Sequence, residues 1–81
     1  MTEQSPNQAK VLTVSDSVEA GNRPDVSGNA LVARLTEAGY EVIEHRVVSD
    51  DVEEITNALS YMAYGFNGLV VTTGGSGFGQ R

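Results

Sequence analysis

Apolar residues in this chain form three short runs, and between the runs they recur at helical spacing. The runs cover residues 10–14, 41–48 and 69–72 and are rich in Val, Ile and Leu, as strands covered on both faces are. The first helical stretch ends near Gly39, and the second is followed by residues 65–68. The apolar positions that indicate the two helices are Ala30, Leu31, Leu35 and Ala38, then Ile55, Leu59, Met62 and Phe66. The chain therefore predicts a β-α-β-α-β order.

Alternation of strands and helices is typical of a parallel sheet in an α/β fold. With right-handed crossovers, a strand order 2-1-3 places the two helices on opposite faces of the sheet. The order 1-2-3 would leave one face bare, which such apolar strands disfavour. We therefore predict a three-layer α/β/α arrangement. Residues 15–28, residues 72–79 and Asp50 would then border one crevice at the carboxyl ends of the strands, where open α/β sheets bind ligands.

Composition and charge narrow the functions that this crevice could serve. A chain of 81 residues has room for one domain, and 5 Lys and Arg against 11 Asp and Glu give a net charge of −6. That balance argues against a broad nucleic-acid or anionic-membrane surface. Any phosphate must then be bound locally, by backbone amides or a metal ion. The absence of cysteine excludes disulfides, thiolate metal sites and a thiol nucleophile.

The amino terminus and the single histidine suggest no chemistry of their own. Residues 1–9 are polar and are expected to form a flexible leader. No apolar run approaches the roughly 18 residues that a membrane span needs, so we expect no membrane contact and a cytoplasmic location. His45 could join a carboxylate metal site, but its place in an alternating strand favours a partly exposed strand residue.

The Gly-rich segment after the third apolar run is the strongest local signal. It contains Thr73, Gly74, Gly75, Ser76 and Gly77. Small residues let backbone N–H groups converge on an anion, so the segment is typical of a phosphate-binding loop. It matches neither the Walker A pattern nor G-x-G-x-x-G. The alternative is a flexible tail.

Two further groups of polar residues follow the other strands. Ser15 and Asp16 come directly after the first, and Asp25, Ser27 and Gly28 precede the first helix. These residues could face a ligand or serve only turns and caps. After the second strand, Asp50 could hold Mg²⁺ against phosphates or cap the second helix, a role open to either Asp50 or Asp51. Asp51 is expected to face solvent.

Together these segments resemble the molybdopterin-binding family of molybdenum cofactor biosynthesis, which includes the molybdopterin adenylyltransferases. The resemblance covers residues 11–81. It rests on V-L-T-V-S-D-S with G-N-R-P-D-V-S-G-N-A-L, then V-V-S-D-D, and finally V-V-T-T-G-G-S-G. The family implies transfer of an adenylyl group from ATP to molybdopterin with Mg²⁺, and a homotrimer whose partners are small molecules.

The resemblance also implies roles for individual residues. Asp50 matches the family's metal-binding and catalytic acid, and residues 73–77 match the loop for the pterin phosphate. The pair Ser15 and Asp16 matches the pocket lining, and Asp25, Ser27 and Gly28 match the stretch that opens the first helix. Ser17 stands where the family commonly has Arg, and Ser49 where it commonly has Pro.

Length separates this chain from the family pattern. The family places a second catalytic Asp and a Thr-Pro-Glu segment after the Gly-rich loop, whereas this sequence ends at Arg81. We therefore expect residues 10–81 to be an N-terminal fragment of such a domain, inactive alone. Two alternatives stay open: a non-catalytic module that binds pterin or nucleotide phosphate, and a competence-damage-type domain that acts on pyridine nucleotides.

Overall fold

The three apolar runs form one parallel sheet. The computed structural model describes residues 7–74. Within them, β1 (Gln8–Val14) lies between β2 (Glu41–Val48) and β3 (Leu69–Gly74), in the order β2-β1-β3. Both strand pairs are parallel. The predicted α/β class and the strand order 2-1-3 are confirmed.

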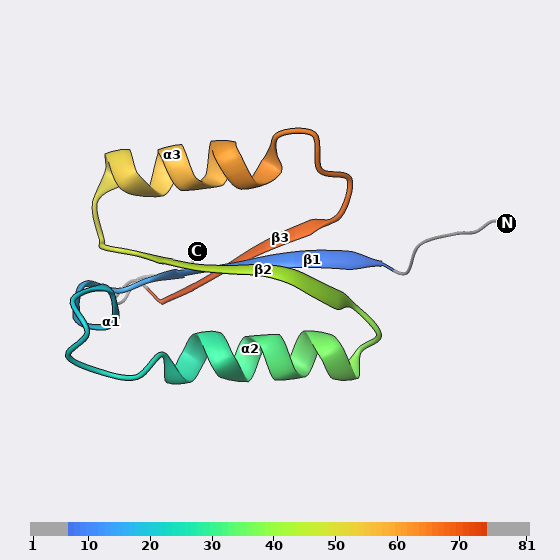
Figure 1. Cartoon of the computed structure of the whole chain (residues 1–81), viewed down its shortest axis with the longest axis horizontal. Helices are drawn as coiled ribbons and strands as arrows, with labels where there is room; N and C mark the ends of the chain where they lie inside the picture. The colour runs from blue at the N-terminus through green and yellow to red at the C-terminus, as the bar shows by residue number, and fades with distance from the viewer. Residues whose placement is uncertain (1–6, 75–81) are drawn as a thin grey trace, which may run out of the picture.

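Two helices of 12 residues each cover opposite faces of this sheet (Figure 1). Helix α2 (Val26–Glu37) connects β1 to β2, and α3 (Val52–Ala63) connects β2 to β3. This is the arrangement that right-handed crossovers require when the first strand is central. None of the helices within residues 7–74 is long and apolar enough to cross a membrane.

The core lies on the central strand because both of its faces are covered. Leu12 and Val14 pack with Ala58 and Met62 of α3. Residues on the other face of β1 point toward α2, and Thr13 among them is 1% exposed. Alternation along one strand therefore divides the core into two halves, one under each helix.

A lysine in the central strand is also accommodated on the α3 side. Lys10 Nζ donates to the carbonyl of Met62 at 2.9 Å and lies 3.4 Å from Glu44 Oε1. The Phe66 ring centroid is 4.3 Å from the same nitrogen. Because Met62 is in the last turn of α3, the ammonium group satisfies a carbonyl that has no partner within the helix. Phe66 lies beyond the end of α3, so its predicted place on the helix face is wrong.

The strand boundaries differ from the prediction at both ends. β1 begins at Gln8, where the sequence predicted a leader, because Gln8 pairs with Glu41 and Ala9 is fully buried. β3 continues through Thr73 to Gly74, which was expected to be loop, because Val14 offers Gly74 a pairing partner. Gly74 has φ +97°, and a Cβ there would overlap the Val14 carbonyl oxygen.

The loop after β1 is more ordered than the sequence indicated. It contains a short helix, α1 (Asp16–Glu19), and α2 already begins at Val26. Ser27 and Gly28 therefore belong to the first turn of α2, and the capping residue is Asp25.

Candidate functional site

A cleft of about 650 Å³ opens at the carboxyl ends of the strands. Its volume is within the range of roughly 300 to 1,000 Å³ that is usual for small-molecule sites. The predicted crevice at the topological switch point thus exists, and all three predicted segments reach it. The lining residues come from the end of β1 and α1, from the start of α2, and from the ends of β2 and β3: Val14, Ser15, Asp16, Ser17, Val18, Arg23, Pro24, Val26, Ser27, Asp50 and Gly74.

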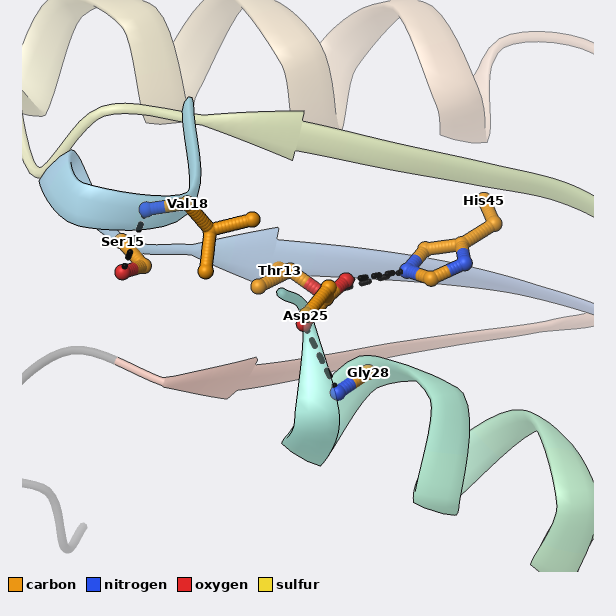
Figure 2. A network of polar contacts seen from close by, with 6 residues as sticks. All are labelled: Thr13, Ser15, Val18, Asp25, Gly28 and His45. Atoms are coloured by element: carbon orange, nitrogen blue, oxygen red, sulfur yellow. Dashed lines mark hydrogen bonds and ion pairs between the residues drawn. The ribbon is translucent and has the colours of Figure 1, made fainter. Parts of the chain in front are cut away.

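Ser15 forms the turn from β1 into the cleft. Its backbone N–H donates to the Val48 carbonyl at 2.9 Å, and its Oγ accepts from the Val18 N–H at 3.3 Å (Figure 2). The side chain is therefore the cap of α1 as well as part of the cleft wall. The two interpretations made from the sequence, turn residue and pocket residue, are compatible here.

Asp16 and Asp50 meet at the cleft although 34 positions separate them. The Asp50 N–H donates to Asp16 Oδ1 at 2.7 Å, which connects the loop after β2 to α1. Asp50 does not cap α3. The cap is Asp51, whose Oδ1 accepts from Glu53 N at 2.9 Å and Glu54 N at 3.1 Å. The capping role considered for Asp50 is thus wrong, and its carboxylate is not used by the helix.

The cleft is lined by oxygen-bearing side chains of the kind that could hold a metal ion. Asp16 and Asp50 supply carboxylate oxygens, and Ser15 and Ser27 supply hydroxyl oxygens on the same cleft. Within residues 7–74, no group of three or more His, Asp or Glu side chains could hold a metal by itself. Mg²⁺ usually keeps several waters and uses one or two carboxylates together with substrate phosphates. The two carboxylates of this open cleft are compatible with that mode of coordination.

Arg23 is the one basic residue that lines the cleft along the described part of the chain. It lies just before α2, where it is exposed to solvent. The sequence contains it within G-N-R-P-D, but nothing in its spacing assigned it a role. It adds one guanidinium group, a good phosphate partner, to a cleft that is also lined by two carboxylate residues.

Asp25 and Gly28 do not line the cleft. Asp25 caps α2 through Oδ1, which accepts from Gly28 N at 2.9 Å, and its Oδ2 lies 2.8 Å from both Thr13 Oγ1 and His45 Nε2 (Figure 2). Gly28 is buried beneath these groups. His45, expected only to be a partly exposed strand residue, is engaged in this network. No local pattern indicated this contact, because the partners of His45 are 20 and 32 positions away.

The Gly-rich loop is only partly described. Gly74 lines the cleft, while Thr73 pairs with Thr13 in the sheet and does not line it. Gly75, Ser76 and Gly77 lie outside the described residues. Their assignment to phosphate binding stays a prediction.

The sequence is similar to known proteins along most of its length. The family described as "Probable molybdopterin binding domain" matches residues 10–81. A molybdopterin adenylyltransferase of Pyrococcus furiosus is 38% identical over 71 residues, which are 88% of this chain and 41% of that protein. The molybdenum cofactor biosynthesis protein B of Staphylococcus epidermidis is 32% identical over 80 residues, 94% of this chain and 44% of the relative.

A CinA-like protein of Geobacter sulfurreducens is 35% identical over 63 residues, 78% of this chain and 15% of the relative. The chain thus spans less than half the length of these curated relatives. The family match nevertheless extends over nearly the whole sequence and includes every element that borders the cleft. The chain therefore belongs to the molybdopterin-binding domain family.

Proposed function

We propose that this chain is the part of a molybdopterin adenylyltransferase that binds phosphate groups and Mg²⁺. The observation that carries the proposal is the 2.7 Å hydrogen bond from the Asp50 N–H to Asp16 Oδ1, which brings the two acidic residues together on a cleft of the right size and place. A relative named molybdopterin adenylyltransferase, 38% identical over most of this chain, supports the choice of reaction.

In the proposed reaction, a phosphate oxygen of molybdopterin forms a bond to the α-phosphorus of ATP, and the bond from that phosphorus to the bridging oxygen breaks. Adenylylated molybdopterin and pyrophosphate are the products. Asp50 and Asp16 would hold the Mg²⁺, which when bound supplies positive charge to the phosphates.

The chain's own residues would orient the reactants. Arg23 and Ser27 border the start of α2, where a cation, a hydroxyl and the positive end of the helix dipole favour negative charge. Gly74 carries no side chain, so the backbone there can approach a ligand closely. Catalysis of this kind rests on positioning and electrostatic stabilisation, without a covalent intermediate on the protein.

Calorimetric titration of the 81-residue chain with molybdopterin, and separately with ATP and Mg²⁺, tests the proposal. We expect binding of both. Asp50→Ala should remove the magnesium dependence of ATP binding, with little change in melting temperature, because the Asp50 contact to Asp16 uses the backbone N–H. Where adenylyl transfer is measurable, it should be lost as well.

Asp51→Ala is the matched control, since it removes the same group one residue away. That change deletes the cap of α3, so it should cost about 1 kcal/mol of stability and leave magnesium-dependent binding in place. The proposed function is wrong if wild type binds neither ligand, or if Asp50→Ala and Asp51→Ala weaken ATP binding to the same extent.

The similarity to a CinA-like protein favours one second candidate. We infer it to be the competence-damage-type domain acting on pyridine nucleotides that the sequence left open. The same cleft could accept the pyrophosphate of such a nucleotide. Titration with NAD in place of ATP separates the two. Tight NAD binding without molybdopterin binding would favour the second candidate.

A further inference from the structure

A polar network lies behind the cleft wall, on the side of the sheet that α2 covers (Figure 2). Asp25 is its centre, with its side chain 11% exposed. Oδ1 accepts from the Gly28 N–H at 2.9 Å, and Oδ2 accepts from the Thr13 hydroxyl at 2.8 Å and lies 2.8 Å from His45 Nε2. One carboxylate thus connects β1, β2 and the first turn of α2.

The chemistry of these groups fixes the direction of the bonds. An ionised carboxylate only accepts hydrogen bonds, and a Thr hydroxyl has one proton to donate. Because Thr13 donates to Asp25, His45 Nε2 must carry a proton and donate to Oδ2 as well. The imidazole is therefore held in one orientation by a charge-assisted hydrogen bond.

Capping alone does not require this arrangement. A cap uses one oxygen of Asp25 for a backbone N–H, which the Gly28 contact already supplies. The other oxygen has two side-chain donors from two different strands, one of them a nearly inaccessible threonine. A helix cap does not need these two additional side-chain donors from the sheet.

The segment that the network holds is the wall of the cleft. Arg23 and Pro24 directly precede Asp25, and Val26 and Ser27 directly follow it, and all four line the cleft. Asp25 itself does not. If the Asp25 main chain shifted after these bonds were lost, the lining residues on both sides of it, Arg23 among them, would move with it.

We propose that His45 and Thr13 are positioning residues for ligand binding: they hold the Asp25 carboxylate, and through it the wall from residue 23 to residue 27, in the geometry that binds phosphate. This inference rests on the proposed function of the cleft. It adds two residues that never touch the ligand.

The test compares His45→Phe, which removes the donor, with His45→Gln, whose amide can donate from a similar position. The first readout is hydrogen exchange of the Gly28 amide by NMR on the 81-residue chain without ligand. We expect exchange at least about tenfold faster in His45→Phe, because the cap opens locally, and recovery in His45→Gln. The second readout is the affinity for ATP with Mg²⁺, which should fall by about tenfold and recover likewise.

Lys10→Met is the matched control for stability. Lys10 lies on the α3 side of the sheet and contacts Met62 and Glu44 there, away from the cleft. The variant should lower the melting temperature while leaving Gly28 exchange and ATP affinity near their wild-type values.

Each other outcome has a definite meaning. The positioning role is refuted if His45→Phe leaves Gly28 exchange unchanged, or if Lys10→Met and His45→Phe weaken ATP binding equally, because loss of stability would then explain the effect. If wild type binds neither ATP nor molybdopterin, the proposed function fails. The positioning of the wall is still decided by the exchange measurement.

Discussion

Replacing Gly28 by alanine puts a methyl group into space that the network behind the cleft already occupies. A Cβ built on Gly28 would overlap Asp25 Oδ2 and Thr13 Oγ1. Neither atom can move away without a substantial loss of stability, because Asp25 accepts from three donors and Thr13 belongs to the central strand. The carboxylate must therefore leave its position, and the α2 cap is lost with it.

The magnitude follows from the bonds that break. Loss of the cap costs about 1 kcal/mol, and leaving the buried Thr13 hydroxyl without its partner costs about 1 to 3 kcal/mol. Alanine in place of glycine within a helix returns about 1 kcal/mol. We expect a net loss of about 1 to 3 kcal/mol in the free energy of unfolding, similar to the usual cost of overpacking a core.

Urea unfolding followed by circular dichroism measures this change, and Asn29→Ala is the control. Asn29 is the next residue of α2 and is exposed, so alanine there should be neutral or slightly stabilising. A loss of each kcal/mol should lower the melting temperature by about 4 to 8 °C. If Gly28→Ala is as stable as wild type, a Cβ at this position does not overlap its neighbours, and our explanation of why glycine occupies it is wrong.

The remaining predictions concern the cleft and one ion pair. Arg23→Gln should weaken ATP binding by about fivefold at low salt and by less at high salt. The control is Arg34→Gln, which removes a basic residue from the last turn of α2 and should leave ATP binding unchanged. Gly75→Val or Gly77→Val should abolish binding of the phosphorylated ligand in calorimetry and leave the circular dichroism spectrum unchanged, because a Cβ blocks close backbone approach. If the ligand still binds both variants, the Gly-rich segment is only a flexible tail. The Arg46 guanidinium, hydrogen-bonded to Glu44, lowers the pKa of that carboxyl, so the ion pair stabilises the fold above the unfolded pKa and its contribution is lost as pH falls through the folded pKa. Glu44→Gln should accordingly destabilise the chain more at pH 7 than at pH 3 in urea titrations, and an equal difference at both would contradict the assignment.

The pattern of apolar residues by itself determined the architecture. Three short segments rich in Val, Ile and Leu favour a sheet covered on both faces, and with right-handed crossovers the order 2-1-3 gives that cover where 1-2-3 does not, so β1 was expected to be central. The crevice followed from that order, because parallel strands end at one edge and bring their following loops together. The sequence alone could therefore place five residues on one site: Ser15, Asp16, Ser27, Asp50 and Gly74.

The tertiary structure alone decided how individual polar groups are used. The choice between Asp50 and Asp51 as the cap depends on backbone angles, and the contact from Asp50 to Asp16 depends on two loops far apart in sequence. His45 joined the network because the register of β2 against β1 sets it opposite Val11, on the same face of the sheet as Thr13, whose Oγ1 its Nε2 approaches. Hydrophobic burial acts along a whole segment and leaves a periodic trace in the sequence, whereas a hydrogen bond depends on two atoms meeting within about 3 Å. No local sequence pattern indicates a hydrogen bond between residues that are brought together only by the fold.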